Sequence, residues 1–267
     1  MARVAVAATA QFGADVLERL ADEHEISALL TRPDARQGRG RHRAPSPAKV
    51  AAERLGVPVL QPERPEQGLD LGAPVVVICA YGLLVPEQLL AERTWLNVHP
   101  SLLPRWRGAA PVERAILAGD TETGVTIHGT VKELDAGPVA AQQAFAIGRD
   151  DDAGTVFAKA VPVAASLLAE VLADPQPVFA AQTSDGVTYA EKITATDRVL
   201  DLSLPAPELV RRVRALSPHI GARTEWHGRP LTVWRGRVAA TGEFEPLEVQ
   251  PDGGRRMDAA AWLRGLR

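Results

Sequence analysis

Two short apolar runs limit the folds open to this chain more than any other feature. Residues 4–8 and 73–79 are built almost entirely from small and β-branched apolar residues, without the alternation of a half-exposed strand. Such runs are typical of parallel strands that are covered on both faces. We therefore expect an α/β fold: a Rossmann-like, mostly parallel sheet with helices on both faces.

A strand end at residues 97–111, which read NVHPSLLPRWRGAAP, is the best candidate for an active site. Asn97 and His99 are two positions apart after a short apolar run, so their side chains would leave the strand on one side. An amide can donate to an oxygen that becomes negative, and an imidazole can exchange a proton near neutral pH. This pair favours acyl or formyl transfer, and Asp135 in the sequence ELDAGP is the candidate carboxylate.

Residues 32–49 form a basic segment that contains Arg36, Arg39, Arg41 and Arg43 between glycines. Arginines on a flexible loop can bind a phosphate backbone and become ordered only on binding. The alternative interpretation is a solvated surface loop.

Charge is distributed unevenly along the chain, although its net charge is only −3. Residues 206–267 carry 11 basic and 7 acidic residues, whereas residues 1–205 carry 19 and 26. A basic tail indicates an anionic partner such as nucleic acid, and Arg211 and Arg212 on a predicted helix at 205–216 are candidate contacts. The alternative is a general bias toward arginine in the sequence.

The length of 267 residues suits one large domain with a small appendage. We expect a catalytic domain at residues 1–204 and a small β-rich module at residues 205–267. Strands are predicted near 222–226, 231–238 and 247–250, and a last helix is predicted after Asp258.

Other patterns argue against several classes of protein. The sequence has no apolar run of about 18 residues and no signal peptide at its start, so we expect a soluble cytoplasmic protein without a membrane span. The single cysteine, Cys79, lies in an apolar run and is predicted to be buried and inert. Zinc-binding spacings are missing, and residues 150–152, three aspartates, are better explained as a helix cap, so no metal is expected.

A family resemblance connects these features. Residues 97–111, together with GVTI at 124–127 and LDAG at 134–137, resemble the signature of the formyltetrahydrofolate-dependent formyltransferases. The RWRGAAP segment at 105–111 is most similar to the methionyl-tRNA formyltransferase branch. The resemblance implies transfer of a formyl group from 10-formyltetrahydrofolate to the α-amine of methionyl initiator tRNA, for translation initiation. We expect a monomeric enzyme that needs no metal.

The resemblance also implies roles for individual residues. Asn97 and His99 would stabilise the oxyanion, while Asp135 would orient His99 and help to remove the proton of the ammonium group. The folate-binding candidates are Tyr81, Gly82, Ser101, Leu102, Leu103, Pro104 and Asp135. The acceptor stem of the tRNA would contact Arg36, Arg39, Arg41 and Arg43 after the second strand, with Arg211 and Arg212 as further candidates.

Two departures from the family pattern stand out. The C-terminal module of the family resembles an OB barrel of roughly a hundred residues, and this shorter one would have lost chain between Ala239 and Leu247. We expect either a reduced OB-like barrel or a partial sheet packed on the catalytic domain. His128 stands where the family usually has methionine or an aromatic residue, and we expect it to pack internally or lie at the surface.

Three other functions remain open at this point. Formylation of a nucleotide-linked amino sugar would use the same three polar residues without needing the basic segment. The shortened tail suggests a non-catalytic RNA-binding paralogue. Hydrolysis of formyltetrahydrofolate is the third alternative.

Overall fold

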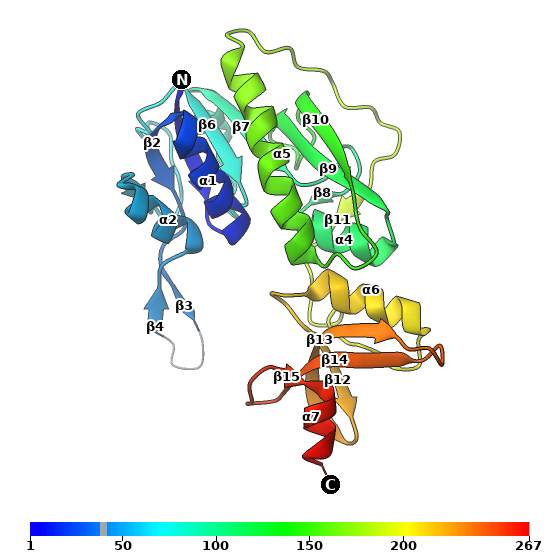
Figure 1. Cartoon of the computed structure of the whole chain (residues 1–267). Coiled ribbons are helices and arrows are strands. Elements are labelled where there is room, and N and C mark those ends of the chain that lie inside the picture. Colours follow the sequence, from blue (N-terminus) through cyan, green and yellow to red (C-terminus); the bar gives the residue numbers. More distant parts are fainter. Residues whose placement is uncertain (38–41, 267) are drawn as a thin grey trace. The chain divides into compact units, whose positions relative to one another are not determined.

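The computed structural model describes residues 1–37 and 42–266, and the side chains of residues 36, 37 and 42 are not described (Figure 1). Arg39 and Arg41 therefore lie outside the described residues. The chain forms two compact units, which we describe separately. The first contains Met1–Arg107, Gly124–Ala144 and Ala158–Thr188, and the second contains Gly108–Thr123, Phe145–Phe157 and Tyr189–Arg267. The boundary expected near residue 205 stays a prediction.

A seven-stranded sheet is the main feature of the first unit. Its order is β10-β9-β7-β6-β1-β2-β5. The pairs from β5 to β7 are parallel, and β9 runs antiparallel to β7. The strands are β1 (Arg3–Ala8), β2 (Glu25–Leu30), β5 (Val59–Leu60), β6 (Val75–Cys79), β7 (Thr94–His99), β9 (Glu122–Gly129) and β10 (Val139–Ala146). The predicted mostly parallel α/β sheet is confirmed.

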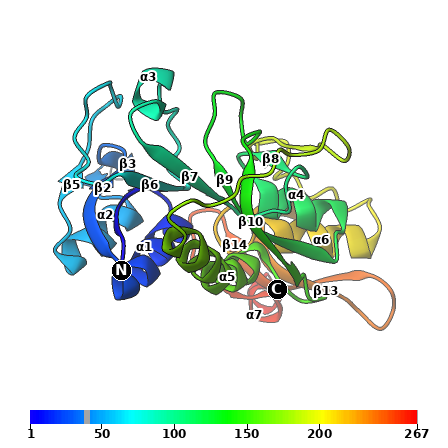
Figure 2. The same ribbon diagram turned by 90° about the horizontal axis from the view of Figure 1, so that it is seen from above.

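Both faces of the central strand β1 are buried, as its unbroken apolar sequence predicts. Ala5 and Ala7 belong to a core cluster with Leu89 and Trp95, whereas Ala8 on the other face lies against α1 (Gln11–Glu23). In Figure 2, α1 and α3 (Glu87–Leu90) lie on opposite sides of the sheet. Strands covered in this way lose exposure on both faces and need no polar residues.

Helix α2 (Pro47–Leu55) follows the second strand and packs beside α1. Ser46 caps it, because its hydroxyl accepts a hydrogen bond from the Lys49 amide at 3.1 Å. Gly56 ends the helix with φ of 69°, a conformation that costs glycine little.

The described part of the basic segment contains two paired strands, where the sequence suggested a flexible loop. Strand β3 (Ala35–Gln37) pairs antiparallel with β4 (His42–Ala44), and Arg36 stands opposite Arg43. The pairing satisfies backbone groups that an open loop would leave to water. Propensity alone does not reveal it, because each strand is only three residues long.

Helix α5 (Ala153–Ala173) is the longest helix among the described residues. Asp152 caps its start, since its carboxylate accepts from the Thr155 amide at 2.8 Å, as the aspartate cluster predicted. The helix is long and apolar enough to cross a membrane by length and composition, with 39% of that window buried. Its buried residues Val156, Ala160 and Leu168 recur at multiples of four, a one-sided stripe typical of a helix that covers a core.

The second unit contains the C-terminal module. Its antiparallel sheet has the order β12-β13-β14-β15. The strands are β12 (Ala222–Trp226), β13 (Arg229–Val238), β14 (Phe244–Pro251) and β15 (Met257–Asp258), and the helices are α4 (Pro111–Ala118), α6 (Ala206–Leu216) and α7 (Ala259–Arg264). A further short pair joins β8 (Arg107–Gly108) to β11 (Tyr189–Ala190).

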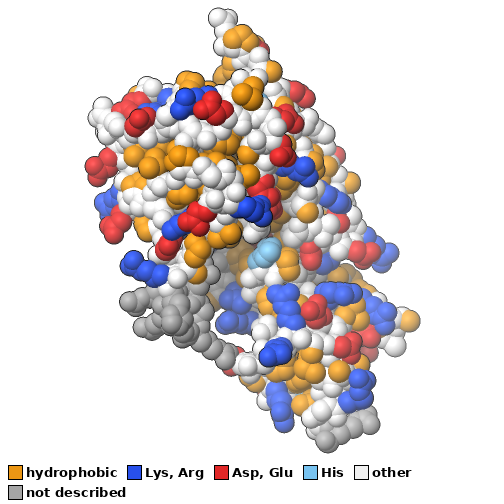
Figure 3. Space-filling view, turned by 60° about the vertical axis from the view of Figure 1, so that its left-hand side comes forward, with side chains coloured by type: hydrophobic (Ala, Val, Ile, Leu, Met, Phe, Trp, Pro, Cys, Tyr) orange, Lys and Arg blue, Asp and Glu red, His pale blue; other side chains and the backbone are white. Residues whose placement is uncertain are grey.

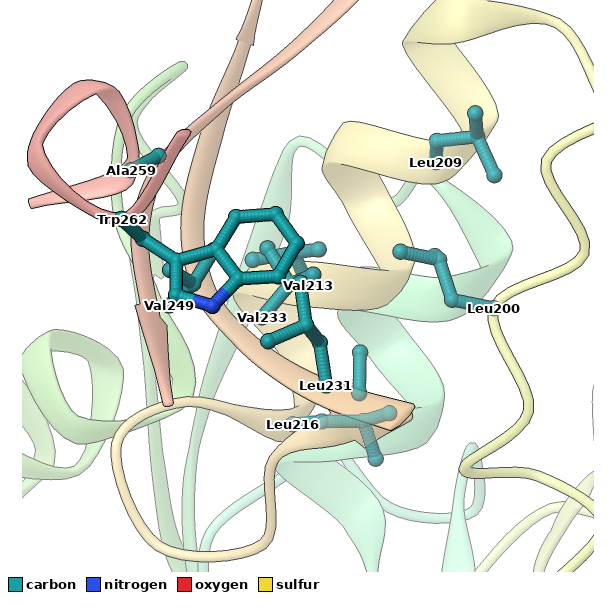
Figure 4. Close-up of a cluster of buried hydrophobic side chains, with 10 residues drawn as sticks. Leu200, Leu209, Val213, Leu216, Leu231, Val233, Val249, Ala259 and Trp262 are labelled. Carbon is teal, nitrogen blue, oxygen red and sulfur yellow. The ribbon is translucent and has the colours of Figure 1, made fainter. Parts of the chain in front are cut away.

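A compact hydrophobic core holds this module together (Figure 4). Trp262 of α7 packs with Val249 and Val233 of the sheet and with Val213 of α6. The four described strands do not amount to a five-stranded barrel. The β13–β14 connection lies in the region predicted to be shortened, and it is a tight turn in which the Ala239 amide donates to the Glu243 carbonyl at 2.8 Å.

Candidate active site

The end of β7 presents Asn97 and His99 on one face of the sheet, as their spacing predicts. Asn97 stands opposite Ile78 on one neighbouring strand and His128 on the other, and His99 stands opposite Thr126. The strand pairing on both sides fixes the backbone from which the two side chains project.

Asn97 uses its amide to connect two partners. Its Nδ2 donates to Oδ1 of Asp135 at 3.0 Å and lies 3.1 Å from Nε2 of His128. His128 Nδ1 lies 2.9 Å from the Gly129 carbonyl oxygen, which can only accept, so this nitrogen carries the proton. His128 Nε2 is then an acceptor, and both amide hydrogens of Asn97 have a partner. His128 is buried in the site, which agrees with the internal position that was one of its two expected alternatives and excludes the surface one.

His99 is only 4% exposed, and an oxygen atom faces each of its ring nitrogens. Nε2 lies 2.8 Å from the Trp106 carbonyl oxygen, while Nδ1 lies 3.6 Å from Oδ2 of Asp135. Burial lowers the pKa of His99, against the opposing effects of Asp135 and of the Trp106 carbonyl. The Trp106 carbonyl can only accept, so the neutral ring carries its proton on Nε2. The lone pair of Nδ1 then points toward Asp135, and His99 and Asp135 together can take up one proton.

Asp135 occupies a tight turn with a φ of 49° and is 8% exposed. Gln182 fixes this turn, because its Nε2 donates to the carbonyl oxygens of Asp135 at 2.8 Å and Gly137 at 2.7 Å. Arg107 in turn donates to Oε1 of Gln182 at 2.6 Å. Sequence reasoning missed Gln182, since an isolated glutamine 47 positions away gives no local signal.

The segment after His99 is held rigidly against β9. Thr126 Oγ1 donates to the Ser101 carbonyl at 2.6 Å and accepts from the Leu103 amide at 3.2 Å. Gln142, also missed from sequence, donates to Thr126 Oγ1 at 2.7 Å and to the Leu103 carbonyl at 3.0 Å. The folate-binding roles of Ser101, Leu102, Leu103 and Pro104 stay predictions.

Tyr81 and Gly82 follow β6 directly. The ring of Tyr81 is buried in the core cluster with Leu89 and Trp95, and burial raises the pKa of its phenol to about 12. Its carbonyl accepts a hydrogen bond from Thr9 at 2.8 Å. The ring thus serves packing, and the folate contact expected from the main chain of Tyr81 and Gly82 stays a prediction.

The predicted RNA-binding residues lie in different units. Arg43 is exposed on the hairpin of the first unit. Arg211 and Arg212 are half-buried on α6 of the second unit, where Arg212 pairs with Glu208 at 3.4 Å. Figure 3 shows Lys and Arg side chains interspersed with apolar ones over the visible surface. These contacts with RNA stay predictions.

The described residues contain no group of three or more His, Cys, Asp or Glu side chains arranged to hold a metal ion. Cys79 is buried in β6, as predicted, and burial raises the pKa of its thiol.

The sequence matches the family described as "Formyl transferase" over residues 2–172 and that described as "Formyl transferase, C-terminal domain" over residues 192–246. The chain therefore belongs to the formyl transferase family, and within it to the methionyl-tRNA formyltransferases. A methionyl-tRNA formyltransferase of Jannaschia sp. (strain CCS1) is 40% identical over 99% of this chain and 97% of its own length. One from Xanthomonas axonopodis pv. citri (strain 306) is 43% identical over 99% and 98%.

Solved structures share the fold. HypX from Aquifex aeolicus in complex with tetrahydrofolic acid superposes with a TM-score of 0.69 at 17% identity, over 98% of this chain and 47% of that chain. A 4-N formyltransferase from Francisella tularensis gives 0.64 at 15% identity, over 92% and 96%.

Proposed function

We propose that this enzyme transfers the formyl group of 10-formyltetrahydrofolate to the α-amine of methionyl initiator tRNA. The product is formylmethionyl-tRNA, which serves translation initiation. The observation that carries the proposal is the convergence of Asn97, His99 and Asp135 in a chain that matches methionyl-tRNA formyltransferases from end to end. The amino-sugar alternative is not favoured, since relatives named for methionyl-tRNA match nearly the whole chain.

The side chains of the site fit a formyl donor. The Asp135 carboxylate accepts a hydrogen bond from the Asn97 amide at 3.0 Å. It also lies 3.6 Å from a ring nitrogen of His99 and 3.6 Å from one of His128. Such a set supplies a donor for a developing oxyanion and a place for one proton. We infer that the backbone of Tyr81 and Gly82 and the segment from Ser101 to Pro104 hold the folate.

The reaction needs no covalent enzyme intermediate. An α-amine has a pKa of about 7.7–8.0, so part of it is free at neutral pH once its ammonium proton has passed to water. The amine nitrogen attacks the formyl carbon, a C–N bond forms, and the formyl oxygen becomes an oxyanion. Asn97 stabilises this oxygen once one of its amide hydrogens turns from Nε2 of His128 to the oxyanion, and the positive charge of the imidazolium that forms at His99 adds to this effect.

One proton then moves across the site. The attacking nitrogen releases a proton to Nδ1 of His99, where the adjacent Asp135 carboxylate stabilises the charge. When the bond from the formyl carbon to the donor nitrogen breaks, that nitrogen takes the proton. The formyl group has then moved from the donor nitrogen to the α-amine, one hydrogen has moved in the opposite direction, and His99 is neutral again.

The acceptor is held by arginines in this proposal. Arg36, Arg39, Arg41 and Arg43 contact the acceptor stem, and Arg211 and Arg212 add contacts from the second unit. The basic composition of these segments supports the assignment. We further propose that the enzyme acts as a monomer in the cytoplasm, where charged initiator tRNA is available.

The test is an assay with 10-formyltetrahydrofolate and charged initiator tRNA, with a control that lacks tRNA. We expect formylmethionine whose formation falls steeply as salt is added. Arg43→Ala should raise KM for the tRNA and reduce this salt dependence. Formylation of an amino-sugar nucleotide instead of the tRNA would overturn the proposal.

A further inference from the structure

The hairpin β3–β4 lies between the end of β2 and the start of α2, and polar side chains link the two ends of the chain at its base. The chain enters after Thr31, at the end of β2, and returns at Ser46, before α2. The hydroxyl groups of these two buried residues lie 3.0 Å apart and form an inner link. A hairpin with two strands of three residues is at best marginally stable by itself, so contacts at its base can influence its direction.

An outer link closes the base with a partly buried ion pair. Lys49 Nζ donates to both carboxylate oxygens of Asp34, at 3.0 and 2.9 Å, and to Oε1 of Gln61 at 2.9 Å. An ammonium group has three hydrogens, and here three acceptors surround it. Gln61 completes the link, because its Nε2 donates to Oδ1 of Asp34 at 2.9 Å and to the Arg32 carbonyl at 2.8 Å.

Lys49 thus differs from Arg43 of β4. Its side chain is 17% exposed and its donors are used within the protein, whereas Arg43 is exposed. The contact with Lys49, followed by that with Gln61, also lowers the pKa of Asp34, so the carboxylate is ionised at neutral pH. The ion pair joins the entry of the hairpin to its exit.

We propose that Asp34, Lys49 and Gln61 form a clamp that sets the direction of the hairpin and thereby positions its exposed Arg43 for the acceptor RNA. The inference rests on the proposed function, in which the hairpin arginines contact tRNA. The three residues are positioning residues, since their polar groups are occupied by each other. A hairpin fixed before binding loses less conformational entropy on binding than a free one.

The clamp and long-range electrostatics predict opposite changes in KM for tRNA. Asp34→Asn removes a negative charge from a surface that binds a polyanion, and long-range attraction alone would lower KM for tRNA. If the clamp positions the hairpin, the same change raises KM for tRNA about fivefold or more, with kcat at saturating tRNA within about twofold. KM for 10-formyltetrahydrofolate should not change.

Two controls separate position from charge. Glu53→Gln changes the charge equally at an exposed site on α2, and its KM for tRNA should stay level or fall. The exchanged pair Asp34→Lys with Lys49→Asp keeps the net charge and restores the ion pair, so KM should return to within about threefold of the starting value. Melting temperatures establish that each variant is folded.

The outcomes are distinct. A KM for tRNA that is unchanged or lower in Asp34→Asn overturns the clamp, and so does an exchanged pair that stays as weak as folded Asp34→Asn. If Arg43→Ala and Arg36→Ala both leave KM unchanged, the proposed RNA contact of the hairpin fails instead. The clamp is supported when both arginine variants and Asp34→Asn raise KM and the exchanged pair restores it.

Discussion

The amide of Asn97 donates to Asp135 Oδ1 at 3.0 Å, which ties the end of a central strand to a turn 38 positions later. Asn97, the proposed oxyanion donor, therefore also positions the Asp135 carboxylate beside His99. The ring of His99 is fixed mainly from its other side, by the Trp106 carbonyl at 2.8 Å. The Asp135 carboxylate lies 3.6 Å from Nδ1 of His99, where its charge can stabilise a proton.

Asp135→Asn should lower kcat by about 10²- to 10⁴-fold and leave the fold intact, because the change removes the charge and keeps the shape. Asparagine tolerates the positive φ of this position, so backbone strain does not confuse the result. Single-turnover formylation and circular dichroism measure the two quantities. Asp22→Asn, at an exposed site on α1, is the control. A variant with kcat within threefold of the parent would exclude the proposed role.

The depressed pKa of His99 makes stability depend on pH. Because burial lowers this pKa below 6.5, the unfolded state binds the proton first as the pH falls. The free energy of unfolding should therefore decrease as the pH drops through 6.5, and level off below the folded pKa. His99→Gln lacks this proton and should show a flatter profile. Urea unfolding between about pH 5 and 8 measures the difference, and identical profiles would contradict it.

Gly137 is required by space in the turn that holds Asp135. A Cβ there would lie 1.7 Å from the Gly129 carbonyl oxygen, a backbone atom that cannot move away. Gly137→Ala should destabilise the protein by more than about 3 kcal/mol or prevent folding. Gly129→Ala is the matched control, since its Cβ would meet only side-chain atoms at 3.6 Å or more. Chemical unfolding of both variants tests the contrast.

Local sequence features predicted the scaffold well. The apolar runs at residues 4–8 and 73–79 became buried parallel strands, and Ser46 and Asp258 cap helices α2 and α7 through their side chains. The side-by-side placement of Asn97 and His99 followed from strand periodicity alone. Such features depend on neighbouring residues, which the sequence displays directly.

Contacts between distant residues were not predictable in the same way. Gln182 and Gln142 stabilise the loops of the site only because the fold brings them there. His128 is similar: on β9 its buried face could mean ordinary packing, and only the pairing with β7 places it beside Asn97. The clamp at the hairpin base needs three segments to meet, so the sequence showed only a basic loop.

Cys79 should report on unfolding. Its thiol is fully buried in β6, and burial raises its pKa, so little reactive thiolate forms in the folded state. A thiol reagent at pH 8 should react slowly with the native protein and rapidly in denaturant. The rate in intermediate denaturant gives the free energy of opening of the central sheet. Fast reaction with the native protein would show that this strand opens locally.

Trp262 tests whether the reduced C-terminal module contributes to tRNA binding. Its ring closes the core over Val249 and Val233, so Trp262→Ala should destabilise the module by about 3–5 kcal/mol. Because Arg211 and Arg212 belong to the same unit, KM for tRNA should rise, while KM for 10-formyltetrahydrofolate stays unchanged. Leu263→Ala is the matched control, since the adjacent side chain is exposed. If Trp262→Ala melts the module and leaves KM for tRNA unaltered, the first unit alone binds the tRNA.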